Sequence, residues 1–398
     1  MSAHYSVSDV KHFTLLWWGG VNIRVTLLAV PPVIPLLHQD LALDPTTIGA
    51  LSGLPIVLFA VTAVFGSLLI ARIGARRAMI AGLFIIGIAS ALRGAGPSLG
   101  VLFAMTFVMG AGIAMIQPAF PAMVRLWLPG SVGLATAIYA NGLLIGEVLS
   151  AALTIPLILP LVNQSWPWSF VVWSVPAVAT AIAIAIWTRD TPGDSGSRTD
   201  LWWPDWSDPV LWRMGLVLGG ASSIYFTSNA FIPDLLHGRG AGEFVGVSLA
   251  VLNIGQLPAS LLIALYPSYF LGRRAPVIAT AAIGAISVIG LLFASDGWIV
   301  VWSGMIGFSA AFILIWTLAL PPMISRPGTV HRLSAGIFTI GYFCSFITPI
   351  LGGIAWDATG IPETVMLPTV VTVGALVISV LGMSLPSHGK SAPGSRHS

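Results

Sequence analysis

The stretch FTLLWWGGVNIRVTLLAVPPVIPLL at residues 13–37 contains a single charged side chain, that of Arg24. A helix needs about 20 predominantly apolar residues to cross the hydrocarbon core of a bilayer, so this stretch predicts a membrane-spanning helix. Arg24 lies about 16 Å along such a helix, near the middle of the membrane. A charge at that depth costs about 2.5–3.5 kcal/mol on insertion scales. We therefore expect Arg24 to face the interior of a helical bundle or a wet cavity.

The composition of the whole chain agrees with a membrane protein. Of its 398 residues, 56% are hydrophobic and 8% are charged, and the mean hydropathy is +0.94. A soluble domain carries about 25% charged residues, so the chain is predicted to be an integral membrane protein. Cys344 is the single cysteine, which excludes a disulfide framework within the chain and a cysteine-based metal site. The net charge of +3 is spread over the loops and does not indicate binding of nucleic acid.

Twelve apolar segments predict twelve transmembrane helices in an all-α fold. These segments lie at about 13–37, 48–71, 78–95, 99–124, 132–160, 167–187, 210–236, 244–268, 275–294, 298–323, 333–356 and 364–385. Lys and Arg residues mark cytoplasmic loops. All of them except Arg24, Arg93 and Arg239 fall on the side that holds the N-terminus. The pattern therefore predicts that both termini are cytoplasmic, in a multi-pass protein of a bacterial-type cytoplasmic membrane.

A polar interruption divides the twelve segments into two sets of six. Residues 188–209 are rich in Gly, Pro, Ser and Asp, a composition typical of a linker. We expect Trp202, Trp203 and Trp206 in this linker to lie at the membrane surface. The predicted organisation is an N-terminal six-helix bundle at 1–187, a cytoplasmic linker at 188–209, a C-terminal six-helix bundle at 210–386 and a disordered tail at 387–398.

The two sets of six resemble each other in sequence. Matching landmarks occur in the same order: VIPLLH (33–38) with FIPDLLH (231–237), LLIARIGARRAMIAG (68–82) with FLGRRAPVIAT (270–280), and QPAFPAMV (117–124) with TLALPPMI (317–324). Repeated halves with a binding site between them near the membrane midplane are typical of secondary transporters. The repeat therefore predicts two pseudo-symmetric six-helix bundles with a central site.

The stretch SLLIARIGARR at residues 67–77 resembles the loop signature G-x-x-x-D-R-x-G-R-R of the major facilitator superfamily. Arg72, Gly74, Arg76 and Arg77 match this signature, whereas Ser67 and Ala71 stand where the family has Gly and Asp. The resemblance covers essentially the whole chain and implies that family's twelve-helix fold, alternating access and a monomer.

Candidate gate residues lie at both ends of the predicted bundle: in the signature loop, and at the outer end of the seventh segment, where Asp234 lies one turn before His237. For this outer end, an ordinary solvent-exposed interfacial residue is the alternative. Arg72 and Arg76 are candidate gate residues at the cytoplasmic end, and Asp234 is a candidate at the opposite end. Because Ala71 replaces the signature's Asp, the charge relay that usually latches the cytoplasmic gate is not assigned here.

Three further stretches resemble the cyanate-permease and nitroimidazole-transporter branch of this superfamily. They are the N-I-R of the first segment, LRGAGP at 92–97, and the IAMIQPAFPAMVRLWLP run of the fourth segment. Members of that branch move small anions or small polar organic solutes. The resemblance thus implies a secondary transporter of a small anion or polar solute, similar to cyanate, nitrate or a carboxylate, with protons as the expected coupling ion.

Arg24 and Glu147 are the principal candidates for chemistry. The always-charged fork of Arg24 suits a planar anion, although Arg24 could instead be a structural partner of Glu147. Glu147 is the one acid expected deep in the membrane, where it could bind the coupling proton or form a static ion pair with Arg24. The two interpretations are compatible, because a substrate anion could displace the carboxylate.

Several polar and aromatic residues are further candidates for substrate binding. They are Asn22, Gln117, Tyr139, Tyr225, Asn253, Trp316 and Tyr342. A lone polar group in a membrane helix is more often a hydrogen bond between helices than a ligand, so this alternative stays open for each. Asn22 lies about 160° around the helix from Arg24 and cannot fully share its face.

Other function classes are weighed against transport of a small anion. The chain has no G-x-x-x-x-G-K-S loop, so we expect neither ATP drive nor a cofactor. It also has no paired His ligands, no G-x-S-x-G and no acidic metal motif, which disfavours a membrane enzyme. An exporter of amphipathic drugs on the same fold remains the alternative, and would have an aromatic pocket with Arg24 neutralised by Glu147. The expected partners are a small substrate, protons and membrane lipids.

Overall fold

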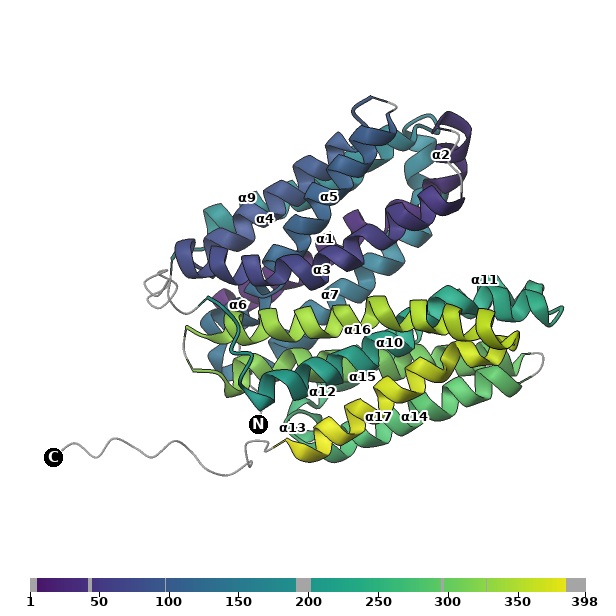
Figure 1. Cartoon of the computed structure of the whole chain (residues 1–398). Coiled ribbons are helices and arrows are strands. Elements are labelled where there is room, and N and C mark those ends of the chain that lie inside the picture. The colour runs from purple at the N-terminus through teal and green to yellow at the C-terminus, as the bar shows by residue number, and fades with distance from the viewer. Residues whose placement is uncertain are drawn as a thin grey trace.

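The structure, a computed structural model, describes residues 6–41, 45–96, 98–190, 202–294, 297–326 and 328–383. Every regular element within these ranges is helical. Figure 1 shows the helices as two groups, one from each half of the chain, that lie against each other. The expected tail at 387–398 and residues 191–201 of the expected linker lie outside the described residues.

The first half forms the helices of six spans. They are α1 (Val7–Leu27), α3 (Pro45–Ile73), α4 (Ala75–Leu92), α5 (Leu99–Ile116) with α6 (Ala119–Trp127), α7 (Val132–Leu153) and α9 (Trp166–Trp187). Shorter elements between them are a 3₁₀ turn (Pro31–Val33), α2 (Ile34–Leu41), a 3₁₀ turn (Pro129–Ser131), a π-helical turn (Thr154–Ile158) and α8 (Leu159–Leu161). The break between α5 and α6 falls at Pro118, because proline has no N–H to continue the helix.

The second half follows the same plan. Its spans are α10 (Pro209–Gly238), α11 (Val245–Ile254) with α12 (Gln256–Leu265), α14 (Arg274–Phe293), α15 (Trp298–Ile324), α16 (Val330–Thr359) and α17 (Leu367–Gly382). Shorter elements are two 3₁₀ turns (Gly242–Phe244 and Pro362–Met366) and α13 (Pro267–Phe270). The break between α11 and α12 falls at Gly255, where a Cβ atom would lie 2.4 Å from the carbonyl oxygen of Gly304.

The helices confirm the predicted all-α membrane fold. Eleven helical stretches of the described chain are long and apolar enough to cross a membrane. The remaining expected span, at 210–236, is α10, whose 30 residues reach about 45 Å and so exceed a hydrocarbon core of about 30 Å. This helix is more polar because hydroxyl side chains, including those of Ser222, Ser223 and Thr227, occupy its central turns.

The first span begins and ends earlier than the apolar run at 13–37 indicated. Ser6 caps the first turn of α1: its hydroxyl accepts from the backbone N–H of Asp9, and the Asp9 carboxylate accepts from the backbone N–H of Ser6. The helix ends at Leu27, before the consecutive prolines Pro31 and Pro32. Arg24 therefore lies in the last turn of α1 rather than in the middle of a continuous helix.

Glycines allow α1 and α7 to approach each other closely. A Cβ atom on Gly142 would lie 2.3 Å from the carbonyl oxygen of Trp17, and one on Gly146 would lie 2.4 Å from that of Val21. Small residues at such contacts let membrane helices pack backbone to backbone. Since Glu147 directly follows Gly146 and Arg24 lies one turn beyond Val21, this contact places the two charged residues side by side.

Enlarging Gly146 is expected to separate α1 from α7. The Gly146→Val substitution should destabilise the protein by about 3 kcal/mol or more, because the clash is with rigid backbone. Gly246→Ala in α11 is the matched control, since a Cβ atom there meets nothing within 4 Å. Thermal melting in detergent would measure both variants. Equal melting temperatures for the two would contradict the proposed close contact.

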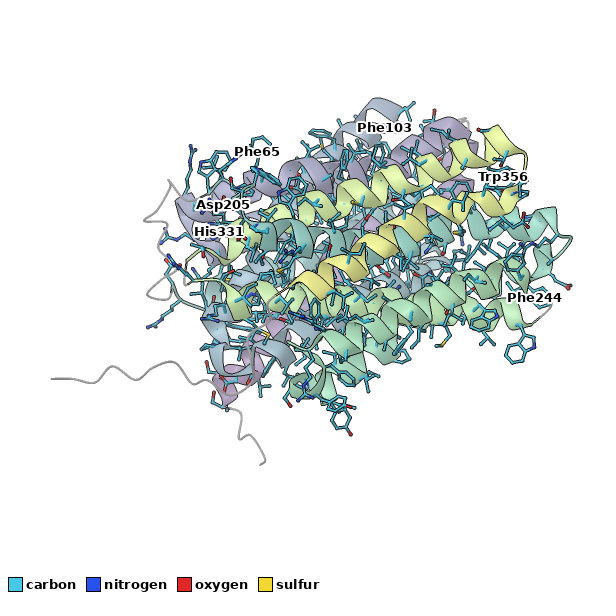
Figure 2. All side chains as sticks on the ribbon, turned by 60° about the horizontal axis from the view of Figure 1, so that its bottom comes forward. Phe65, Phe103, Asp205, Phe244, His331 and Trp356 are labelled. Atoms are coloured by element: carbon cyan, nitrogen blue, oxygen red, sulfur yellow. The ribbon has the colours of Figure 1, made fainter. Side chains whose placement is uncertain are left out.

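The two halves are joined toward one end of the molecule, here named the linker end because α9 finishes and α10 begins there. Arg125 donates to the carbonyl oxygen of Pro322, and Asn141 donates to Ser260 at 2.9 Å. Figure 2 shows Asp205 and His331 at the linker end, and Phe244 and Trp356 at the opposite, far end. Across the halves, α3 lies along α16 and α7 lies along α12.

The described part of the linker contacts both halves. The Ser67 hydroxyl of α3 donates to the carbonyl oxygen of Trp202 at 2.6 Å. On the other half, Arg332 of α16 forms an ion pair with Asp205 at 3.5 Å. Trp202, Trp203 and Trp206 follow one another edge to face. The linker thus bridges α3 and α16 at the linker end.

Candidate functional site

A buried ion pair lies between α1 and α7. The Nη1 atom of Arg24 is 3.3 Å from Oε1 of Glu147, and the two residues are 9% and 6% exposed. Arg24 also benefits from its position in the last turn of α1, because the partial negative charge of a helix C-terminus favours a cation. The Nε atom of Arg24 has no hydrogen-bond partner in the described chain, so part of its donor capacity is unused.

Polar side chains of the second half extend this pair across the interface between the halves. Gln256 donates to Oε2 of Glu147 at 3.2 Å and to the side-chain oxygen of Asn253 at 3.3 Å. The Tyr225 hydroxyl donates to the same Asn253 oxygen at 2.7 Å. Gln256 and Asn253 flank the break at Gly255, so the interruption in this span positions both amides. The result is a polar chain that runs from Arg24 in α1 to Tyr225 in α10.

Two cavities adjoin the ion pair. The first, here named the central cavity, measures about 30 Å³ and is bounded by residues of both halves: Arg24, Leu143, Leu144, Glu147, Ala221, Ser222, Tyr225, Phe226, Gln256, Ala310, Leu314 and Tyr342. The second, the far cavity, measures about 110 Å³. It extends from the same pair along the end of α1 and the first half of α3. Arg24, Glu147, Tyr225 and Phe226 belong to both walls, so the two cavities meet at the ion pair.

Some of the candidate residues predicted from sequence line the central cavity or lie directly behind it. Arg24, Glu147, Tyr225 and Tyr342 line the central cavity, and Asn253 is bonded to Tyr225 directly behind it. This part of the site thus comes together from five helices of both halves: α1, α7, α10, α11 and α16.

Three other candidates are buried and contribute to neither of the two cavity walls. Gln117 donates to the Tyr342 hydroxyl at 3.3 Å. Tyr139 packs against Phe120, and its hydroxyl has no partner in the described chain. Trp316 is fully buried, and its indole nitrogen is likewise without a partner.

Asn22 lies apart from the two cavities. Its amide donates to the carbonyl oxygen of Trp18 at 2.7 Å and to the Thr180 hydroxyl of α9 at 2.8 Å. Asn22 is fully buried against α9, on the face of α1 away from the cavities. Its role in the structure is therefore a hydrogen bond between helices, which follows from its angular distance from Arg24.

The hydrogen bonds described here for the predicted gate residue Arg76 lie within the first half. Arg76 donates to Thr188 and to the carbonyl oxygen of Ala185, at the C-terminal end of α9 within its own half. Arg72 and Asp234 are exposed, and no ion pair of the described chain includes either one. Arg76 thus caps a helix, because the carbonyl groups of the last turn of α9 need donors.

Asp190 completes the contact between Arg76 and the end of α9. Its carboxylate accepts from Arg77 at 2.5 Å and from Arg76 at 3.0 Å. The hydrogen bond from Arg77, together with that from Arg76, holds the pKa of Asp190 below its ordinary value. A carboxyl group with a lowered pKa stabilises the fold above its unfolded-state pKa, and this contribution disappears as the pH falls through the folded-state value.

We expect Asp190→Asn to lower the melting temperature slightly at neutral pH. The difference from the wild type should shrink as the pH falls through the acid range and vanish only below the lowered folded-state pKa of Asp190, where the carboxyl group is protonated in both states. It should also shrink in high salt, because the pair is at the surface. Melting curves of both proteins at neutral and acid pH would test this. A difference that persists unchanged at acid pH would contradict it.

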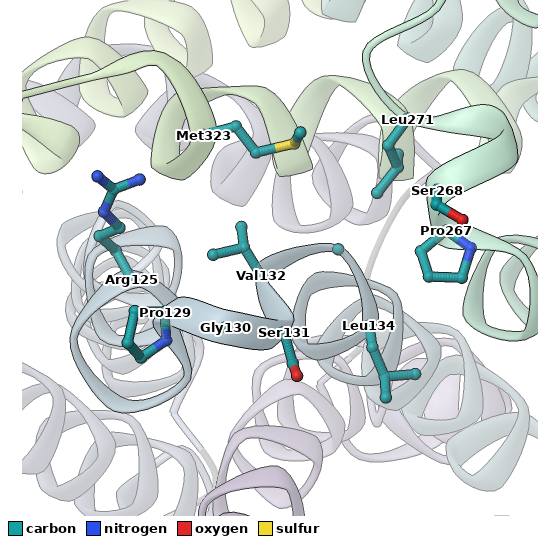
Figure 3. Close-up of a pocket in the computed structure, with 11 residues that line it drawn as sticks. Arg125, Pro129, Gly130, Ser131, Val132, Leu134, Pro267, Ser268, Leu271 and Met323 are labelled. Atoms are coloured by element: carbon teal, nitrogen blue, oxygen red, sulfur yellow. The ribbon is translucent and has the colours of Figure 1, made fainter. Parts of the chain in front are cut away.

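A cavity larger than these two is separate from the ion pair. A cleft of about 470 Å³ lies at the linker end, between the start of α7 and the residues that follow α12. Figure 3 shows Val132 and Leu134 on one side of this cleft, and Met323 and Leu271 on the other. Its one charged side chain, that of Arg125, already donates to Pro322. We therefore place the site at the smaller cavities, where the polar groups converge.

Two residues of this region were not predicted as site residues. Gln256 lies three residues after Asn253 in the sequence, and its direct bond to Glu147 depends on how the halves face each other. Arg93 lies near the end of the apolar segment at 78–95, and it is fully buried in the wall of the far cavity. A signal for Arg93 did exist, because it is a cation on the side that is otherwise poor in Lys and Arg.

The chain is similar to known membrane transporters. A sequence profile described as Major Facilitator Superfamily matches residues 16–320. The 2-nitroimidazole transporter of Escherichia coli (strain K12) is 26% identical over 349 residues, which cover 86% of this chain and 87% of that protein. The cyanate transport protein CynX of the same organism is 24% identical over 344 residues, which cover 86% and 88%.

A solved structure shares the fold. The transporter FucP, in its outward conformation, superposes with a TM-score of 0.74 over 94% of this chain and 99% of FucP. The sequence identity is 14%, so this likeness concerns the arrangement of helices alone.

Proposed function

The chain belongs to the Major Facilitator Superfamily, and from this premise we propose that it moves a small anion or small polar organic solute by proton-coupled alternating access. Members of this family are multi-pass membrane transporters, and this chain is such a transporter and not an enzyme. The proposal assigns substrate binding to Arg24 and proton coupling to Glu147. The site lies between the bundles at 1–187 and 210–386, and both termini are on the cytoplasmic side.

The observation that carries the proposal is the buried pair of Arg24 and Glu147 at the interface between the halves. Two charges removed from water are expensive to maintain, and a neutral, well-packed pair of side chains is often as stable. A role of the two charges in substrate binding and proton coupling explains why the pair lies beside cavities and not in a fully packed core. An arginine fork is suited to a planar anion, because its donors are fixed in one plane.

The pair also provides a simple way to link anion and proton. When Glu147 takes up a proton, its charge is lost and the Arg24 guanidinium is released to bind the anion. One proton and one monovalent anion then enter together, so the total charge of the site does not change. Gln256 holds the carboxyl group in place in either state, because its amide can donate to it or accept from it.

Alternating access follows from where the halves are joined. The contacts of Arg125 with Pro322 and of Asn141 with Ser260 lie on the linker side of Glu147. To release the substrate at the linker end, the halves must break these contacts and rock apart there. A monomer with two rocking halves is sufficient for this cycle.

The names of the two relatives agree with a small substrate. One is described as a transporter of 2-nitroimidazole and the other of cyanate. Both are small and polar, and cyanate is an anion. These descriptions support the class of substrate proposed here and leave its identity to experiment.

A second candidate function is export of amphipathic drugs. Two observations favour it: Arg24 is neutralised by Glu147, and aromatic rings of Phe226 and Tyr342 line the central cavity. In this alternative the ion pair is structural, and the substrate binds to the apolar wall.

Thermal melting of the purified protein with a panel of ligands distinguishes the two functions. The panel contains small anions (cyanate, nitrate, acetate and benzoate), a neutral analogue of each carboxylate, and lipophilic cations. A ligand at a hundred times its dissociation constant stabilises the folded state by about 2.7 kcal/mol. Stabilisation by anions alone supports the proposal. Stabilisation by lipophilic cations or neutral amphiphiles, with no response to anions, supports drug export.

A further inference from the structure

A second arginine lies in the protein interior with little to neutralise it. Arg93 follows the last turn of α4 and is 0% exposed. Its Nη2 atom donates to the carbonyl oxygen of Thr26 and to the Ser90 hydroxyl, both at 2.8 Å. The guanidinium also lies 4.2 Å from the ring centre of Phe170, on α9. These contacts fix the side chain between α1, α4 and α9.

The remaining donors of Arg93 are unused. Its Nε and Nη1 atoms, which carry three of the five N–H groups, have no hydrogen-bond partner in the described chain. No ion pair of the described residues includes Arg93, whereas Arg24 is paired with Glu147. A buried cation without a counter-charge is strongly unfavourable within a membrane, so such residues commonly mark the path of a substrate or ion.

Arg93 forms part of the wall of the far cavity. The same wall contains Thr106 of α5, whose buried hydroxyl also has no hydrogen-bond partner in the described chain. The rest of the wall is largely apolar and includes Phe59 and Met109. Two unpartnered polar groups therefore border one cavity, and this cavity continues to Arg24 and Glu147.

We propose that Arg93 and Thr106 form a second anion-binding subsite, on the far side of Arg24, for a small monovalent oxyanion such as nitrate or a carboxylate. The charges of the cavity wall support a single negative charge: Arg24 and Glu147 cancel each other, and Arg93 leaves one positive charge. The unused N–H groups of Arg93 donate to the anion, and the Thr106 hydroxyl donates to another of its oxygens. Both groups are covered by neighbouring atoms, so flexible wall residues such as Met109 move aside when the anion enters.

This inference rests on the proposed function, because it assumes that the cavity conducts an anion. It adds that the anion is attracted first by Arg93, whose charge is not offset, and reaches Arg24 after Glu147 is neutralised. Two successive cationic positions would let a substrate move inward without passing through a fully apolar region.

The test is a titration of the full-length protein with sodium nitrate and sodium acetate, followed by thermal melting. Sodium gluconate, a bulkier anion, keeps the ionic strength constant. We expect Arg93→Gln to raise the apparent Kd at least about tenfold, since charge-assisted hydrogen bonds are lost. Arg93→Lys keeps the charge and should remain within about threefold of wild type, and Thr106→Val should weaken binding about two- to fivefold. The measured quantity is the Kd, because a purely structural Arg93 would change the melting temperature without changing the Kd.

The possible outcomes separate this inference from the proposed function. If wild-type protein responds to the anions and Arg93→Gln retains the same Kd, the second subsite is wrong and the role of Arg24 is unaffected. If wild-type protein responds to neither nitrate nor acetate, the second subsite is wrong, whereas the proposed function fails only if the wider ligand panel also gives no response. Should Arg93→Gln fail to fold, Thr106→Val decides alone: a weaker Kd supports the subsite, and an unchanged Kd contradicts it.

Discussion

Replacing Arg24 with Gln is expected to abolish anion-dependent stabilisation and transport. The substitution removes the charged fork, and the loss of two charge-assisted hydrogen bonds is worth about 3 kcal/mol, or roughly 100-fold in Kd. It also leaves Glu147 buried without its cation, which should lower the free energy of unfolding by about 3–5 kcal/mol. Anion titrations followed by melting, and uptake into proteoliposomes, would measure the two effects separately.

Two further variants show whether the loss of binding is more than a loss of stability. In the double variant Arg24→Gln/Glu147→Gln neither charge remains, so most of the stability should return while anion binding stays absent. Arg273→Gln is the matched control. Arg273 is exposed, its guanidinium lies over the ring of Tyr269, and it lines neither of the two cavities beside the ion pair. If Arg24→Gln binds the anion within about threefold of the wild-type Kd, Arg24 is structural and drug export becomes the better account.

Replacing Glu147 with Gln is expected to separate anion binding from proton coupling. The amide has nearly the same shape and can still accept a hydrogen bond from Gln256, but it cannot take up a proton. Arg24 is then permanently available, so we expect the anion to bind at least as tightly as in wild type. Exchange of anion across the membrane should continue, whereas accumulation against a concentration gradient should fall to a ratio of about 1, because the proton gradient no longer contributes.

Exchange and accumulation can be measured in the same preparation of proteoliposomes. Glu243→Gln is the matched control, because this acid is exposed in the 3₁₀ turn at the far end and should leave accumulation unchanged. Accumulation by Glu147→Gln equal to that of wild type would show that the proton uses another path. Loss of both exchange and anion binding would show that the carboxylate is needed for binding itself.

Much of the architecture could be predicted from local sequence patterns. The apolar segments, the linker and the paired landmarks of the halves indicated the helices, because span length and hydrophobicity are local properties. By sequence, Glu147 was a possible partner of Arg24, and the structure holds the two side chains 3.3 Å apart. Each charge was isolated in its apolar segment, so the two were natural partners.

The details that sequence could not supply depend on how helices face one another. Gln256 reaches Glu147 only because α7 and α12 lie side by side across the interface. Arg93 is near the end of the apolar segment at 78–95, and the sequence does not show that its side chain turns into the bundle toward Thr26 and Phe170. Likewise, the expected gate residue Arg76 binds the end of α9, which no sequence pattern connected to it.

Unlike these contacts between helices, the early start of α1 could have been predicted from the sequence. Ser6 and Asp9 have the spacing of a capping box, which marks a helix beginning at Val7. Hydrophobicity alone predicted a start at Phe13, because the first turns of this membrane helix contain polar residues.

The most direct test of the central claim is to measure proton uptake when the anion binds. Purified protein in a weakly buffered solution is mixed with the anion that stabilises it, and the pH change is recorded. If Glu147 is protonated as the anion replaces it on Arg24, wild type should take up about one proton per bound anion, and Glu147→Gln should take up none. Anion binding to wild type without any proton uptake would contradict the coupling of the two events at this ion pair.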